Sequence, residues 1–464
     1  MKRLIALLAT ALLLCSCANK AVTRYETIAP VLKKEGFDGA IAKIKEDPDE
    51  LYGEKSEWLY HFDLGTLYHY NGDNKKSIKH FEKAEQIYDE LYTKSVTNEA
   101  AALVTNDNIR PYRARPFEII LMYQYQILNY LAMKDVEGAL VEVKRAQIAL
   151  EALYQKDQEK VNDNGFLRYL CAIVYEMAGE SDDAAISYIQ AAKAYREGNI
   201  QMPPEVWEFI SESLTQMDRR EDLKALKMKP MKETPIASDV RQKGQEIIVV
   251  GYAGHSPILG ELYMSGTFVS GGAMNMTYKD GKTGEMRSMT LIAPTVPNGN
   301  GGTFHIGFAL PEKKPLPQLA RKFDVKVDGM KIIPEKVVSV NAELDKNIEE
   351  ETPTTITRTA VRVTIRTIAA QIAKEKTQTG NAGLNLLKNI AVDVGQAQLE
   401  QADLRIGLFM PNSVYMTRIP VEPGAHKVKV RALDKQGNVV SDYAFDKVKV
   451  AKGQKKILIV PAIE

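Results

Sequence analysis

The sequence predicts an α+β multidomain protein. An N-terminal α-solenoid of helix pairs would precede an antiparallel, sandwich-like β domain with a helical hairpin insertion. The apolar residues recur with a helical period up to about Met228 and alternate as in strands from Glu246 onward. The helical period returns only between residues 351 and 401. With 464 residues, the chain is too long for one core, so several domains are expected.

The stretch from Trp58 to Glu85 has the spacing of one helix-turn-helix repeat. Gly65 and Ala84 would let two helix backbones approach closely, while Tyr68 and Phe81 fill the space around them. This pattern resembles a tetratricopeptide (TPR) unit, which cannot bury its apolar face alone. Neighbouring units are therefore expected, and the sequence supplies three candidates: Val22 to Glu46, Phe117 to Leu153 and Phe166 to Tyr195.

Changes in periodicity and composition divide the chain into six parts. These are a signal peptide at 1–16, a TPR-like helical domain at 17–228, a linker at 229–245, a β domain at 246–350, a helical hairpin insertion at 351–401 and a C-terminal β module at 402–464. In the hairpin, Arg358, Arg362 and Arg366 would form a basic stripe opposite an apolar side. The hairpin would either pack on the sheet, which we favour, or lie against an anionic membrane surface.

The N-terminus has the pattern of an export signal. Two basic residues precede the apolar run from Leu4 to Leu14, which is too short to span a bilayer. Cys17 follows the small residue Ser16, as in a bacterial lipobox, so we expect Cys17 to be lipidated; an ordinary signal peptide cut near Ala18 is the alternative. Ala18 after the cysteine is typical of sorting to the outer membrane. Cys171 would then be the only free thiol, buried as a small apolar side chain.

The charge of the chain is balanced. Removal of Lys2 and Arg3 from the 61 basic residues leaves 59 against 60 acidic ones, so no footprint for nucleic acid is expected. The loop from Arg110 to Pro116 carries three arginines. Such a loop could recognise a carboxylate or phosphate, or it could fix the chain through Glu118 or through carbonyl contacts, which we favour.

No catalytic or cofactor motif is complete. The six histidines lack metal-ligand spacing, and we expect His61 and His69 at solvent or groove positions rather than at a metal. Ser256 follows an apolar run as a nucleophile would, but Pro257 after it has no N–H to act as an oxyanion donor, so a β turn is expected. We expect no enzyme activity, cofactor or metal.

The order of these parts resembles a family of poorly characterised bacterial TPR-containing outer-membrane lipoproteins. Besides Cys17, the stretches that carry the resemblance are Leu128 to Leu131, Gly138 to Ala146, Tyr169 to Ala184, Gly307 to Pro311, Ala402 to Arg405 and Arg418 to His426. The segment from Val421 to Val430 is similar to the PEGA type of bacterial surface β domain. The resemblance implies an envelope lipoprotein without known catalytic activity. Its implied partner is a lipoprotein similar to an activator of penicillin-binding proteins.

Two functions therefore remain open. The first is a scaffold held on the outer membrane, facing the periplasm or the cell surface. Its concave repeat surface would bind an envelope protein or peptide, in cell-wall or surface-structure assembly. The side chains expected to bind the partner are Tyr60, His61, Tyr68, Tyr123, Gln126, Tyr130 and Arg168. The alternative is a carbohydrate- or peptidoglycan-binding protein, or an unrecognised hydrolase, with a site in the β region.

Overall fold

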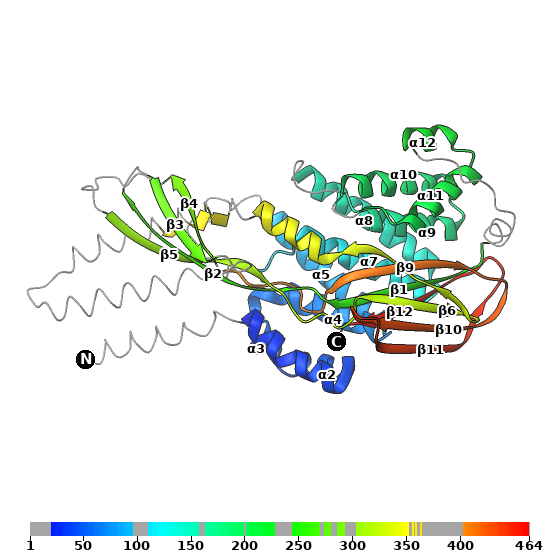
Figure 1. The fold of residues 1–464 in the computed structure, drawn as a ribbon, viewed down its shortest axis with the longest axis horizontal. Coiled ribbons are helices and arrows are strands. Elements are labelled where there is room, and N and C mark those ends of the chain that lie inside the picture. The colour runs from blue at the N-terminus through cyan, green and yellow to red at the C-terminus, as the bar shows by residue number, and fades with distance from the viewer. Residues whose placement is uncertain are drawn as a thin grey trace, which may run out of the picture.

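The computed structural model has helices in its first half and mostly strands after them (Figure 1). It describes residues 20–95, 110–156, 163–198, 201–227, 244–269, 273–279, 285–292, 303–351, 355–356, 358–359, 362–363 and 402–463. Cys17 and most of the expected hairpin at 351–401 lie outside these residues. The combination of helices with mostly antiparallel sheets confirms the α+β class.

The helical part contains three consecutive helix pairs, α4 with α5, α7 with α8 and α9 with α10. The helices are α2 (Lys20–Glu46), α3 (Pro48–Leu51), the 3₁₀ turn η2 (Glu54–Ser56), α4 (Glu57–Tyr70), α5 (Asn74–Ser95), α7 (Pro116–Ala132), α8 (Val136–Lys156), α9 (Gly165–Ala178), α10 (Ser181–Glu197), α11 (Pro204–Gln216) and α12 (Arg220–Ala225). Gly36, with φ 68°, breaks α2 into two helical parts. Among the described residues, no helix has both the length and the apolarity needed to cross a membrane.

The contact between α4 and α5 depends on a glycine. A Cβ atom added at Gly65 would lie 2.6 Å from Cε1 of the Phe81 ring, so a larger residue would force the two helices apart. The Ser77 hydroxyl donates a 2.7 Å hydrogen bond to the carbonyl oxygen of Gly65 at the same contact. Phe81 and Ala84 are fully buried. The close approach expected from Gly65 and Ala84 is therefore confirmed.

The strands form three four-stranded sheets, with orders β12-β1-β9-β8, β11-β10-β6-β7 and β4-β3-β2-β5. Their bounds are β1 (Glu246–His255), β2 (Ile258–Val269), β3 (Ala273–Lys279), β4 (Met286–Ile292), β5 (Thr303–Lys314), β6 (Lys322–Val327), β7 (Met330–Ile332), β8 (Glu335–Ser339), β9 (Pro411–Pro420), β10 (Gly424–Leu433), β11 (Val439–Val450) and β12 (Lys455–Ala462). The described neighbours pair antiparallel except β1 with β12, which pair parallel. The expectation of a purely antiparallel β region is wrong at this pair.

The first two sheets each combine strands from distant parts of the chain. In the first, β1 and β8 come from 246–350, whereas β9 and β12 come from 402–464; in the second, β6 and β7 pair with β10 and β11 in the same way. The expected division into a β domain and a separate C-terminal module therefore does not hold at the level of the sheets. A helix at 340–351 follows β8.

Strand β1 is buried along its whole length because it has a protein layer on each side. Ile248 and Val250 belong to the core shared with the helices, whereas Ile247 and Val249 belong to the core shared with the second sheet. The molecule thus has a helical layer, a central sheet (β12-β1-β9-β8) and an outer sheet (β11-β10-β6-β7). The third sheet (β4-β3-β2-β5) extends to the left of this body (Figure 1). The helices therefore share their core with the central sheet, so the helical domain expected at 17–228 has no core of its own among the described residues.

Candidate functional site

The side chains expected to bind a partner are more enclosed than the sequence suggests. Tyr68, Tyr123 and Gln126 are buried, so the expectation that they are exposed is wrong. The remaining four, Tyr60, His61, Tyr130 and Arg168, are half-buried. Two of the buried side chains pack against α5, since Tyr68 stacks on His80 and the Tyr123 hydroxyl donates to Glu85.

A nonhelical segment at residues 402–410, the start of the expected C-terminal β module, contains no strand and covers part of the helices. The helical residues hold this segment mainly by its backbone. Glu118 accepts a hydrogen bond from the Gly407 N–H at 3.0 Å, and Asp63 accepts one from the Leu408 N–H at 2.8 Å. Three side chains donate to its carbonyl oxygens: Arg24 to Ile406, Tyr70 to Phe409 and Arg115 to Arg405.

The arginine loop takes part in this internal contact. The Arg115 N–H donates a 2.8 Å hydrogen bond to Glu118, and its guanidinium donates to the carbonyl oxygen of Arg405 at 2.9 Å. Burial raises the pKa of Glu118, although Arg115 and the Tyr112 hydroxyl oppose that shift. The interpretation that the loop fixes the chain through Glu118 and carbonyl contacts is therefore confirmed.

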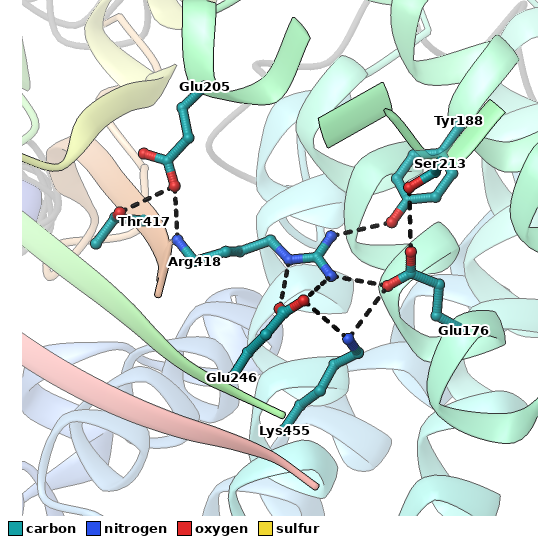
Figure 2. A network of polar contacts seen from close by, with 8 residues as sticks. All are labelled: Glu176, Tyr188, Glu205, Ser213, Glu246, Thr417, Arg418 and Lys455. Atoms are coloured by element: carbon teal, nitrogen blue, oxygen red, sulfur yellow. Dashed lines mark hydrogen bonds and ion pairs between the residues drawn. The ribbon is translucent and has the colours of Figure 1, made fainter. Parts of the chain in front are cut away.

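A second contact between helices and sheet is a buried ion network around Arg418 of β9 (Figure 2). Its guanidinium donates to Glu246 of β1 at 2.7 and 2.9 Å, to Glu176 of α9 at 2.8 Å and to the Tyr188 hydroxyl at 3.0 Å. Lys455 adds a second cation, 3.1 Å from Glu246. Burial alone would raise the pKa of Glu246, but Arg418 and Lys455 outweigh it and hold that pKa at about 2. The network joins the two layers with balanced charge.

Glu205, at the start of α11, lies beside this network (Figure 2). Its carboxylate accepts hydrogen bonds from the Thr417 hydroxyl at 2.9 Å and the Arg418 N–H at 2.7 Å. Burial raises its pKa to about 7, and these hydrogen bonds only partly oppose that shift.

Glu205 should make stability fall as the pH rises. Its folded pKa lies above the unfolded value of about 4.5, so its contribution is complete below that value and is lost as the pH rises through 7. We expect Glu205→Gln to remove about 2.5 kcal/mol of the difference in unfolding free energy between pH 5 and pH 8. Urea unfolding at both pH values measures this difference. An unchanged difference would contradict the assignment.

Of the two histidines expected at solvent or groove positions, His69 is buried and His61 is half-buried. His69 lies between Asn129 and Tyr252, with Nδ1 2.7 Å from the amide oxygen and Nε2 2.9 Å from the hydroxyl. Burial lowers its pKa to about 4, so it is neutral at physiological pH. Within the part of the chain that the structure describes, no group of three or more His, Cys, Asp or Glu side chains could hold a metal ion.

The turn at Ser256 connects β1 to β2, as expected. The Ser256 N–H donates to the carbonyl oxygen of Met410 at 2.8 Å, and the side chains of Ser256 and His255 are both buried. Cys171 is also buried, and burial raises its thiol pKa to about 12, which keeps it protonated. These groups are enclosed in the core, where a substrate would not reach them.

Two grooves lie on opposite sides of α8. The first, here called the α5–α8 groove, has a volume of about 750 Å³, and Tyr123 of α7 also lines it. The second, the α8–α10 groove, has a volume of about 590 Å³ and contains Arg168. Two of the seven expected binding residues therefore line grooves, although neither groove is the expected concave surface.

Polar contacts fix both of these residues. The Tyr123 hydroxyl donates a 2.6 Å hydrogen bond to Glu85 in the α5–α8 groove. In the α8–α10 groove, Nε of Arg168 lies 2.9 Å from each carboxylate oxygen of Asp163. Tyr123 is thus part of the groove floor, and Arg168 is neutralised within the chain.

Three large apolar side chains are exposed next to these grooves. Ile148 lines the first and is 69% exposed, whereas Ile186 lines the second and is 47% exposed. Val141, seven residues before Ile148 on α8, is 50% exposed. An outer helical face that combines grooves with exposed apolar side chains is the surface best suited to a protein partner. The sequence contains one indication of this face, because Glu82, Glu85 and Asp89 recur at helical spacing and so place acidic side chains along one side of α5.

No family model matches the chain, and no curated protein matches its sequence.

Proposed function

We propose that the protein is a lipid-anchored envelope scaffold without catalytic activity, which binds a protein partner through the outer face of its helical layer. The helix pairs would be TPR-like repeats in a short solenoid, and the two sheets that share a core would form a sandwich with a PEGA-like segment. Such repeats generally serve to bind proteins or peptides. The expected partner is an envelope protein or peptide, for which a lipoprotein similar to an activator of penicillin-binding proteins is a candidate.

The observation that carries this proposal is the pair of grooves flanking α8, with Ile148 and Ile186 exposed within them. The inner helical surface is a poorer choice, because residues 402–410 and the central sheet already contact it. A partner would have to displace these contacts to reach that surface. On the outer face, Ile148 and Ile186 are exposed with respect to the residues that the structure describes.

Site-specific photo-crosslinking in intact cells tests the binding face. A photoreactive residue at Ile148 should give a discrete adduct with one envelope protein, identified by mass spectrometry. Ala444, an exposed position on β11, is the matched control and should give none. Loss of the Ile148 adduct in an Ile186→Lys variant would show that one partner spans both grooves. Adducts at Ala444 alone, or at neither position, would overturn the proposal.

The anchor is tested separately. Cys17→Ala should abolish acylation and release the protein from membranes, because tri-acylation provides firm anchoring that no other segment is expected to provide. Membrane fractionation after a salt wash measures the release, and Cys171→Ala is the control that leaves the lipobox intact. If the Cys17→Ala protein still sediments with the outer membrane, the lipid is not its anchor.

A further inference from the structure

The α5–α8 groove has an excess of negative charge. Glu82, Glu85, Asp89 and Glu90 of α5 line it, and Arg145 of α8 is its one basic lining residue in the described part of the chain. Burial raises the pKa of Glu85, and the same cause raises the pKa of Asp89; Arg145 opposes both shifts. Four of the side chains that line the groove are thus carboxylates, and one is a guanidinium.

Arg145 makes long contacts with two carboxylates, Glu85 and Glu142. Its Nη1 atom lies 3.3 Å from Glu85 and 3.5 Å from Glu142, both long for charged hydrogen bonds. The Glu142 side chain is only 2% exposed, and its Oε2 atom has no hydrogen-bond partner among the described residues. A buried acceptor without a donor lowers stability. A second cation that paired with Glu85 would leave Arg145 free to bind Glu142 more closely.

The opposite wall of the groove is apolar. Ile148, Ala149 and Ala152 of α8 face the acidic residues of α5 across it. A groove between two helices has the shape into which the ridge of a third helix fits. The matching ligand therefore has apolar side chains on one stripe and basic side chains beside it.

We propose that the α5–α8 groove binds a basic amphipathic helix of the partner protein. Its apolar stripe lies on Ile148, and its Lys or Arg side chains pair with Glu82, Glu85 and Asp89. This inference rests on the proposed scaffold function and adds the chemistry of the partner segment.

Fluorescence anisotropy with the detergent-solubilised full chain tests the proposal. The probe is a synthetic amphipathic helix with leucines on one side and lysines on the other, and its counterpart has glutamates in place of the lysines. The lysine peptide should bind the wild type, and its affinity should fall about tenfold in Glu82→Gln/Asp89→Asn, because two exposed charge pairs are lost. Ile148→Ser should weaken it similarly, and the glutamate peptide should not bind.

The matched control is Asp49→Asn/Glu50→Gln, which removes the same charge from exposed positions on α3. Its affinity for the lysine peptide should equal that of the wild type. Equal weakening in both double variants, or binding of the glutamate peptide, would overturn the proposal. If crosslinking at Ile148 captures an envelope protein while the lysine peptide fails to bind, the basic-helix inference fails and the scaffold function stands. If the lysine peptide binds but crosslinking at Ile148 captures no envelope protein, the scaffold function fails and the preference of the groove for a basic helix stands.

Discussion

Replacing Arg418 with methionine is expected to lower the free energy of unfolding by about 3 to 5 kcal/mol, because it leaves buried carboxylates without their main cation. The Arg418 side chain is 2% exposed and pairs with both Glu246 and Glu176. Lys455 would then have to serve both carboxylates, and it lies 3.6 Å from Glu176. Urea unfolding measures the loss, and the helical layer should separate from the central sheet at lower urea than in the wild type.

Two controls separate this effect from general damage. Arg220→Met removes an arginine whose side chain is 83% exposed, so its unfolding midpoint should match that of the wild type. Arg418→Met/Glu246→Gln removes one carboxylate together with the cation and should recover part of the lost stability. If Arg418→Met unfolds at the wild-type midpoint, the network does not hold the layers together.

Local sequence pattern predicted much of the secondary structure and its close contacts. The repeat at Trp58 to Glu85 corresponds to α4 and α5, and Gly65 faces Phe81 as expected. The apolar run from Ile247 to Val250 coincides with β1, and the alternating residues around Val428 and Val430 coincide with β10. These features depend on residues close in sequence, so a period of 3.6 or 2 reveals them.

The arrangement of the layers could not be predicted in the same way. The parallel pairing of β1 with β12 joins Glu246 to Lys455, and no local period reports a contact across so many residues. The sequence of α7 nevertheless indicates that this helix is covered, because it is apolar around most of its circumference; in the structure it is buried along nearly its whole length. A helix of that kind is covered on several sides. Tyr123 and Gln126 lie on it, so their expected exposure conflicted with this indication.

The candidate site was predicted only in part for a related reason. Repeat position identifies the inner helices, but it does not show whether the protein's own chain already occupies them. Asp63 and Glu118 bind backbone N–H groups of residues 402–410, and from sequence alone these carboxylates could equally have faced a partner. The acidic spacing on α5 was readable, yet only the structure shows that α8 faces it with Ile148 across a groove.

Gly407→Leu is expected to displace the segment at residues 402–410 from the helices. A Cβ atom at this position would lie 2.6 Å from Cε1 of the buried Phe62 ring, so the larger side chain has to displace either that ring or the backbone, and we expect the backbone to move. Such movement would also separate Glu118 and Asp63 from the N–H groups that they bind. Overpacking and the loss of buried hydrogen bonds together should lower the unfolding free energy by about 3 to 5 kcal/mol.

Hydrogen exchange by mass spectrometry locates this effect. Amides of residues 402–410 and of α4 should exchange faster in Gly407→Leu, whereas those of β10 and β11 should not. Gly424→Leu makes the same change on β10, where the nearest atom to an added Cβ is the His426 Nε2 at 3.9 Å, so it should leave both regions protected. Unchanged protection of residues 402–410 in Gly407→Leu would mean that Phe62 can move aside, and that Asp63 and Glu118 hold the segment without help from packing at Gly407.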